Sequence, residues 1–234
     1  MKLMNLIFPK QCVCCGQTGE YLCKDCKKNL KPHPEICPYC HRFSANYQTC
    51  LNCKLNRKNY LDGLIITFCY SDWIKKLILR LKYYHRKDVG DFLAERLGLA
   101  IQSNQLFQFI IPNSSFLISY VPSHRYRHYF RKWYNQSEIL AKKLEKKIWL
   151  PVINLFKKVK NTHSQTDLKR NQRLENLKNV FQLNEWLKLN GNETIIIVDD
   201  ITTTGATLNE LAKLVKNKWP KIKVWWLVLG RHIG

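Results

Sequence analysis

The chain has 234 residues, with 39 Lys or Arg against 17 Asp or Glu, so its formal net charge is +22 at pH 7. A charge of this size favours an anionic partner: nucleic acid, a membrane surface or a phosphorylated substrate. A hydrophobic content of 45% excludes a disordered basic arm. No stretch reaches about 18 apolar residues, and the apolar run 3–8 is too short for a signal peptide. We therefore expect a cytoplasmic protein without membrane insertion.

Cysteine pairs dominate the first quarter of the chain. Eight of the ten cysteines form four C-x-x-C pairs: Cys12/Cys15, Cys23/Cys26, Cys37/Cys40 and Cys50/Cys53. In a reducing compartment this spacing predicts metal-bound thiolates rather than disulfides. Eight ligands suit two structural Zn²⁺ ions, which would stabilise a segment too short to bury a core unaided. We expect a zinc-binding module at 1–56 and a second domain at 57–234.

The eight ligands can be divided between the two ions in two ways. The short distances between neighbouring pairs favour sequential sites, in which the first two pairs bind one ion and the last two bind the other. A crossed arrangement, first pair with third and second with fourth, is the alternative.

Apolar runs and helical stripes alternate beyond the cysteines. We expect strands at 61–70, 117–121, 151–158 and 224–229, and helices at 73–84, 89–103 and 137–147. The stretch 105–116 is left open between an insertion and an edge element. Strands that alternate with helices predict an α/β fold with a parallel sheet and crossover connections.

Two basic segments, 82–87 and 125–134, interleave cations with aromatic rings. This mixture suits a phosphate backbone whose bases stack on the rings. It predicts contact with single-stranded DNA through seven residues: Lys82, Tyr84, Arg86, Arg127, Tyr129, Arg131 and Trp133. The alternative is that the rings belong to the core and the charges to ordinary solvated faces.

The segment 195–207 carries the most specific signal. Four β-branched residues, 195–198, predict a buried parallel strand, and Asp199 and Asp200 follow at its carboxyl end. A hydroxyl-rich turn around Gly205 then opens a helix expected at 206–217. The backbone N–H groups and dipole of a helix start attract an anion, and Gly205 permits close approach. Because adjacent carboxylates destabilise a fold unless a ligand uses them, we expect a ribose 5-phosphate here.

This segment resembles the fingerprint of the type I phosphoribosyltransferases, which bind 5-phosphoribosyl-1-pyrophosphate (PRPP). The resemblance implies that Asp199 and Asp200 are the catalytic pair and bind the ribose 2- and 3-hydroxyls. It assigns the 5-phosphate to Thr202, Thr203, Thr204, Gly205, Ala206 and Thr207. It also implies a pyrophosphate loop after Pro122, with Ser123, His124 and Arg125 as candidates, and Mg²⁺ that accompanies the diphosphate.

The order of the motifs resembles the ComF family, phosphoribosyltransferase-like proteins linked to bacterial DNA uptake. After the cysteine pairs come Leu81-Lys82-Tyr83, Val121-Pro122, Tyr134-Asn135-Gln136, Gln165-Thr166-x-Leu168 and the aspartate fingerprint. One departure is Trp133, where the family usually has glycine; it excludes a positive-φ backbone there and adds a large ring. The resemblance implies a type I phosphoribosyltransferase-like sheet, and PRPP, single-stranded DNA and other DNA-uptake proteins as partners.

Two functions follow from these features. The first is a PRPP-binding, phosphoribosyltransferase-like protein that acts in natural transformation and contacts single-stranded DNA. The second is a metabolic phosphoribosyltransferase that transfers ribose 5-phosphate from PRPP to a base or nucleotide. Both are compatible with a phosphoribosyltransferase whose acceptor is unknown. In that reaction a nitrogen nucleophile of the acceptor displaces pyrophosphate from C1 of PRPP.

Overall fold

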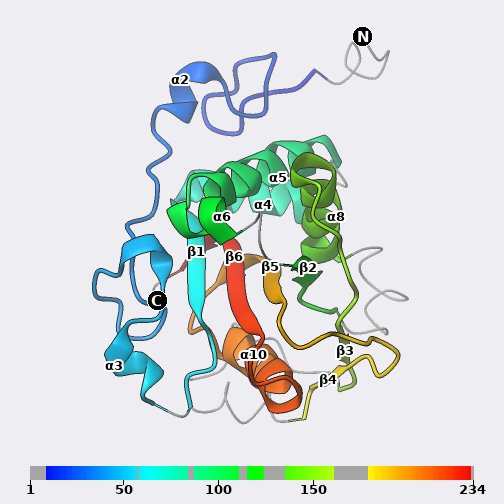
Figure 1. Cartoon of the computed structure of the whole chain (residues 1–234). Helices are drawn as coiled ribbons and strands as arrows, with labels where there is room; N and C mark the ends of the chain where they lie inside the picture. The colour runs from blue at the N-terminus through cyan, green and yellow to red at the C-terminus, as the bar shows by residue number, and fades with distance from the viewer. Residues whose placement is uncertain are drawn as a thin grey trace.

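A computed structural model describes residues 9–56, 58–83, 87–110, 115–123, 135–160 and 179–232. Its centre is a parallel sheet of four strands, in the order β1 (Gly63–Cys69), β6 (Lys223–Arg231), β5 (Thr194–Thr202) and β2 (Phe116–Tyr120). Figure 1 shows this sheet between helices, with the cysteine-rich segment outside it. The structure confirms the expected α/β architecture.

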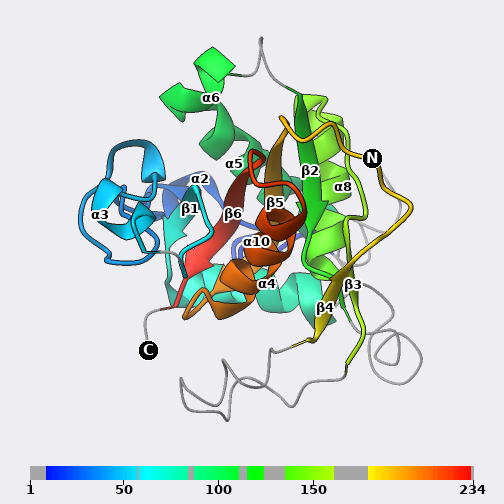
Figure 2. The ribbon, with the colours of Figure 1, turned by 60° about the horizontal axis from the view of Figure 1, so that its bottom comes forward.

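Helices cover both faces of the sheet. One face carries α4 (Asp72–Tyr83), α5 (Lys87–Gln102) and α8 (Gln136–Ile148), and the other carries α10 (Ala206–Lys218). Figure 2 shows α10 in front of the sheet and the other three behind it. The helix α6 (Gln105–Ile110) follows α5, so the stretch left open by the sequence begins with a helix.

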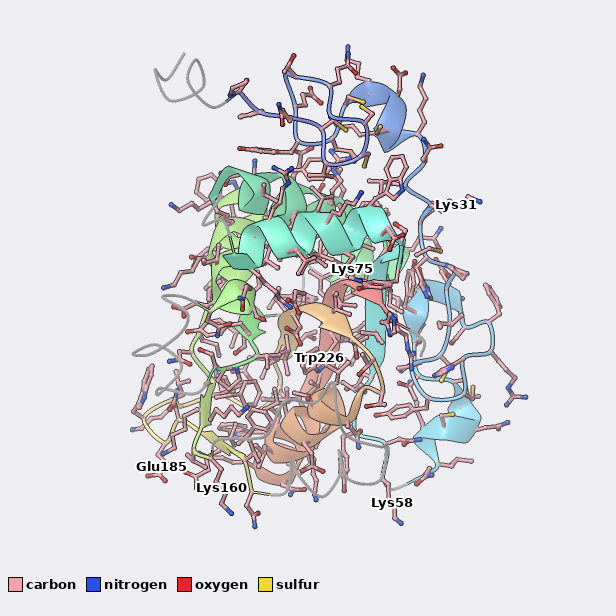
Figure 3. The ribbon with its side chains drawn as sticks, turned by 180° about the vertical axis from the view of Figure 1, so that it is seen from behind. Lys31, Lys58, Lys75, Lys160, Glu185 and Trp226 are labelled. Atoms are coloured by element: carbon pink, nitrogen blue, oxygen red, sulfur yellow. The ribbon has the colours of Figure 1, made fainter. Side chains whose placement is uncertain are left out.

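Alternate side chains of β5 enter two different cores. Ile196 and Val198 pack with α4, α5 and α8, whereas Ile195 and Ile197 pack with α10. The adjacent β6 repeats this alternation and places Trp226, which is fully buried, on the α10 side. Figure 3 shows Trp226 at the centre of the molecule. A parallel strand buried on both faces requires a continuous apolar run, as the sequence has.

Gly63 of β1 makes room for Trp225 of β6. The two residues pair across the parallel ladder, and a Cβ at position 63 would lie 2.2 Å from the Trp225 ring. That ring packs edge-on against Phe107 of α6, with 5.1 Å between the ring centroids. The glycine is therefore required by packing across the strand pair.

The expected strand at 151–158 is wrong in extent and in partner. Only β3 (Phe156–Lys158) is a strand, and it pairs antiparallel with β4 (Phe181–Leu183) outside the main sheet. Upstream, Val152 forms a single parallel bridge with Ile118 of β2. Pro151 has no N–H to donate, and the ladder beside β2 is limited to this bridge.

The connections that leave β2 and β5 diverge. From β2 the chain runs through α8 to the Val152 bridge, away from the centre of the sheet. From β5 it runs through α10, on the opposite face, to β6 on the other side. In open α/β sheets, ligands bind at the carboxyl ends of strands where connections separate in this way.

The cysteine-rich segment contacts the sheet domain at two places. Its helix α2 (Lys24–Lys27) lies near α4 and α5, whereas η1 (Ala45–Tyr47) and α3 (Leu51–Lys54) lie beside β1 (Figure 1). The division of the chain at residue 56 stays a prediction, because both parts share hydrophobic cores with later elements. Within the ranges that the structure describes, no helix is both long and apolar enough to span a bilayer.

Candidate functional site

The aspartate pair lies at the carboxyl end of β5, between β6 and β2. Ser137 Oγ, at the start of α8, donates a 2.7 Å hydrogen bond to Asp199 Oδ1, which also accepts from the Asp200 N–H at 2.9 Å. Asp200 Oδ1 accepts from the Ile201 N–H at 2.7 Å, and its Oδ2 lies 2.7 Å from Lys82 Nζ. Groups from α4, α8 and β5 thus orient the two carboxylates.

The environment of Asp199 changes its acidity. Burial raises its pKa to about 7, and the Asp200 carboxylate adds to the rise. The hydrogen bonds from Ser137 and the Asp200 N–H, together with the charge of Lys82, oppose it. A carboxyl perturbed in this way at a strand end is a common property of ligand-binding and catalytic sites.

The turn after β5 leads into α10. Thr202 is buried at the end of β5, whereas Thr203 and Thr204 are exposed. Gly205 is the N-cap of α10, and its φ of 73° lies in the left-handed region that favours glycine. Gly205 has no side chain to cap the helix, and Thr204 Oγ1 accepts a hydrogen bond from the Ala206 N–H, with 3.4 Å between oxygen and nitrogen. Such a helix start attracts an anion.

Two neighbours of the acids were unexpected. The sequence predicts Lys82 as a nucleic-acid contact, whereas the structure places its amine against Asp200 with 27% of the side chain exposed. The sequence predicts no role for Ser137. This serine is positioned by Asn135, which accepts from the Ser137 N–H at 3.2 Å and donates to the Val121 carbonyl at 2.8 Å. No local pattern signals a contact between residues 62 positions apart.

Much of the predicted pyrophosphate and nucleic-acid surface lies outside the described residues. Ser123 is described, just beyond the end of β2. The predicted residues outside the described ranges are Tyr84, Arg86, His124, Arg125, Arg127, Tyr129, Arg131 and Trp133. The structure therefore brings together the acids, the turn and Lys82, and leaves these other assignments as predictions.

The eight paired cysteines gather into two groups. Cluster 1 consists of Cys12, Cys15, Cys23 and Cys26, and cluster 2 consists of Cys37, Cys40, Cys50 and Cys53. Within each cluster the sulfur atoms all lie within 4.8 Å of one another. The grouping is sequential, as the sequence favoured, and not crossed.

Both clusters have the dimensions of a zinc site. The sulfur atoms of Cys15 and Cys23 are 3.6 Å apart, and those of Cys40 and Cys50 are 3.7 Å apart. A ZnS₄ tetrahedron with bonds of about 2.3 Å has edges of about 3.8 Å, whereas a disulfide bond is about 2.05 Å long. Four sulfurs fill the coordination of Zn²⁺, so the ion would supply a structural cross-link in each cluster.

Cluster 2 is connected to the edge of the sheet that carries the acids. Arg231, the last residue of β6, pairs with Thr202 of β5 and is 5% exposed. One of its terminal nitrogens donates to the Pro38 carbonyl at 3.2 Å, and the other lies 2.6 Å from His41 Nε2. Both partners lie beside cysteine ligands of cluster 2 in the sequence.

Tyr39 provides a second connection. Its hydroxyl donates to Asn209 Oδ1 of α10 at 2.7 Å and accepts from the Leu61 N–H at 2.8 Å. The position of cluster 2 is therefore coupled to the first turns of α10, which follow the phosphate-binding candidates.

Curated relatives align with most of this chain. It is 33% identical to Competence protein F of Haemophilus influenzae over 210 residues. The aligned part covers 88% of the chain and 89% of that relative. The chain belongs to the ComF family. It is also 28% identical to Competence protein ComFC of Bacillus subtilis (85% and 79% covered) and to DNA utilization protein YhgH of Escherichia coli (88% and 89% covered). No family model matches the chain.

The ComF membership confirms the resemblance drawn from the order of the motifs. In this ComF chain several of those motifs meet at one edge of the sheet. Lys82 of the first motif contacts Asp200 of the last, and Asn135 hydrogen-bonds to Val121. Segments far apart in the sequence thus assemble around a single pair of acids.

Proposed function

We propose that this ComF protein binds PRPP and acts in DNA uptake. One observation carries the PRPP assignment: two oriented carboxylates lie beside a helix start with glycine at its N-cap, at the end of one strand. This arrangement suits ribose hydroxyls on one side and a phosphate on the other. The names of the relatives, two competence proteins and a DNA utilization protein, support the role in uptake.

In this proposal Asp199 and Asp200 accept hydrogen bonds from the ribose hydroxyls, and the turn 202–207 binds the 5-phosphate. Ser123 and the basic residues after it bind the pyrophosphate. Mg²⁺ enters with that diphosphate, because it prefers phosphate oxygens and water as ligands. Lys82 fixes the orientation of Asp200 through their 2.7 Å contact.

Calorimetric titration of the zinc-loaded protein with PRPP and Mg²⁺ tests the ligand assignment. Asp199→Asn/Asp200→Asn keeps the side-chain shape and removes both charges. We expect an affinity loss of at least about 100-fold, because each lost charge-assisted hydrogen bond contributes about 1.5–3 kcal/mol. The control Asp25→Asn/Asp91→Asn makes the same charge change at exposed positions and should bind PRPP normally. Unchanged affinity in the first variant would reject the proposal.

Contact with single-stranded DNA is the second part of the proposal. It is supported by the net charge of +22 and by the two segments that mix cations with rings. Phosphate contacts release counterions, so we expect log K to fall linearly with log salt, by about 0.7 for each phosphate contacted. Fluorescence anisotropy with a labelled oligonucleotide between about 50 and about 200 mM salt measures this slope. A flat response contradicts the electrostatic account.

The acidity of Asp199 favours a second candidate, a phosphoribosyltransferase with turnover. A pKa of about 7 suits proton exchange at neutral pH. A nitrogen of a base or nucleotide would form the new bond to C1 as the C1–O bond breaks. Pyrophosphate would leave with the electron pair, and the nitrogen would pass its proton to the Asp199 carboxylate. Pyrophosphate release, assayed over a panel of bases and nucleotides, detects such turnover; PRPP binding without release favours the first candidate.

A further inference from the structure

A cavity of about 670 Å³ lies between the cluster 2 segment and the start of α10. The turn residues 204–206 form one part of its wall, Pro38 and Tyr39 form another, and Arg231 lines it as well. Its volume falls within the range of about 300–1,000 Å³ that is typical of small-molecule sites. The function proposed above uses only the wall that the turn forms, where the 5-phosphate binds.

The cavity extends from the turn toward β1. Leu61, just before β1, and Leu64, in β1, line it. Ser123 follows β2, which lies on the other side of β5 from β1. A PRPP molecule with its 5-phosphate on the turn, its ribose over the acids and its pyrophosphate toward β2 reaches only the turn end of this cavity. The part of the cavity toward β1 has room for a second ligand.

The charges that line the cavity are mostly positive. Lys58, Lys213 and Arg231 face a single acid, Glu210, and within the described ranges none of the three forms an ion pair. Arg231 is 5% exposed, and its Nε has no hydrogen-bond partner. A buried cation of this kind favours an anionic ligand.

The remaining lining groups suit a flat heterocycle. Tyr39 and Tyr60 line it with aromatic residues, and Leu61 with an apolar one. Asn56 Oδ1 accepts from the Lys58 N–H at 3.0 Å and Asn59 Nδ2 donates to the Cys53 carbonyl at 2.9 Å, so a ligand can use the amide donors of Asn56 and the amide oxygen of Asn59. Bases stack on aromatic rings, and amide groups can hydrogen-bond to base edges. An anion joined to a flat, hydrogen-bonding ring is the composition of a nucleotide.

We propose that this cavity is a nucleotide-binding subsite. Lys58 and Lys213 bind the phosphate, and the wall of tyrosines and asparagines binds the base. The nucleotide is either free or one unit of a single strand, because both sources share this chemistry. Figure 3 shows Lys58 between α10 and the α3 segment, with its side chain directed to solvent, where an extended strand can reach it.

Titration of the zinc-loaded full chain with thymidine 5′-monophosphate and with a short 5′-phosphorylated oligothymidylate tests the subsite. We expect Lys58→Glu/Lys213→Glu to weaken binding of both at least about tenfold, because two charged contacts become repulsive. The control Lys146→Glu/Lys147→Glu makes the same net charge change in the last turn of α8, away from the cavity, and should change affinity less than about twofold. An oligonucleotide that binds at least about tenfold more tightly than the mononucleotide identifies a strand as the source. Equal affinities identify the free nucleotide.

Three results would overturn the subsite: equal losses in both double variants, no binding of either nucleotide to the wild type, or displacement of the nucleotide by inorganic phosphate at equal affinity.

Titration of the same variants with PRPP separates this proposal from the previous one. Because the two sites share the turn 204–206, Lys58→Glu/Lys213→Glu should lose less PRPP affinity than nucleotide affinity, and Asp199→Asn/Asp200→Asn should keep its nucleotide affinity. Nucleotide binding without PRPP binding in the wild type rejects the proposed function and keeps the subsite; the reverse rejects only the subsite.

Discussion

Clusters 1 and 2 are built from the same paired cysteines, yet they attach to the sheet domain differently. The cluster 1 segment packs through buried apolar side chains, since Val13, Tyr21 and Leu22 share one core with α4 and α5. The cluster 2 segment packs only partly buried side chains, Ile36 and Tyr39 among them, on the α10 side and adds hydrogen bonds from Tyr39 and to Pro38 at the edge that carries the acids. The same metal-binding unit thus supports a helical layer in one case and a candidate ligand site in the other.

Of the variants that compare the two clusters, loss of cluster 2 should have the largest effect on PRPP binding. Cys37→Ser/Cys40→Ser removes two ligands, so one Zn²⁺ is lost and with it several kcal/mol of folding free energy, on the order of the binding energy of a structural ion. Pro38 lies between these ligands and would lose its place beside Arg231. We expect PRPP affinity to fall at least about tenfold, measured by calorimetry alongside zinc content.

Cys12→Ser/Cys15→Ser is the matched variant in cluster 1. It should also lose one Zn²⁺ but keep its PRPP affinity within about twofold, because its contacts are with α4 and α5. Near-ultraviolet circular dichroism shows whether both variants remain folded. Equal losses of affinity in two folded variants would remove the distinction between the clusters.

Truncation of Leu22 tests the apolar attachment of cluster 1. The side chain is 1% exposed in the core shared with α4 and α5. Leu22→Ala should lower the free energy of unfolding by about 2–5 kcal/mol, which urea denaturation measures. PRPP affinity under native conditions should not change; a cost below about 1 kcal/mol would show that the segment is only loosely attached.

Proton binding by Asp199 distinguishes the acid pair from both clusters. Its folded pKa of about 7 lies above the unfolded value, so the folded state holds a proton that the unfolded state releases, and stability falls as pH rises toward 7. PRPP affinity should change in the opposite direction, rising about tenfold from pH 6 to pH 8 as the carboxylate forms. Asp199→Asn should abolish both trends, whereas Cys12→Ser/Cys15→Ser should keep them.

The hydroxyl of Tyr39 should give the smallest of these effects. Tyr39→Phe leaves the Leu61 N–H without its partner, whereas Asn209 Oδ1 keeps its hydrogen bond from the Tyr60 N–H; the change should cost about 1–3 kcal/mol in a thermal or urea transition. On the cluster 1 side, Lys27→Gln removes an exposed ion pair with Glu20 and should cost less than about 1 kcal/mol. Equal costs would argue against a special role of hydrogen bonds at cluster 2.

The parts predicted from the sequence are those with a local pattern. The run 195–198 is apolar throughout because both faces of β5 are buried, and the cysteine spacing reveals the ligand sets. The strands β3 and β4 have three residues each, too few to show a period of two. The strand predicted at 151–158 is therefore longer than the observed one.

The contacts that assemble the candidate site have no local signal. Ser137 and Lys82 reach the acids from helices remote in the sequence, and Arg231 reaches Pro38 across almost the whole chain. Only the packing of the helices and cluster 2 on the sheet creates these polar contacts. Sequence patterns identify such residues as helical or basic, but they do not identify their partners.

The ion pair of Lys82 has a consequence for how a polyanion arrives. Two bare aspartates would present two negative charges to an incoming phosphate, yet Lys82 neutralises one, and at pH 7 a pKa of about 7 leaves the other half protonated. The acid pair with Lys82 is therefore close to electrically neutral, while the whole protein carries a net charge of +22. A phosphorylated ligand meets long-range attraction and little local repulsion, so its association should be fast at low ionic strength and slow as salt is added.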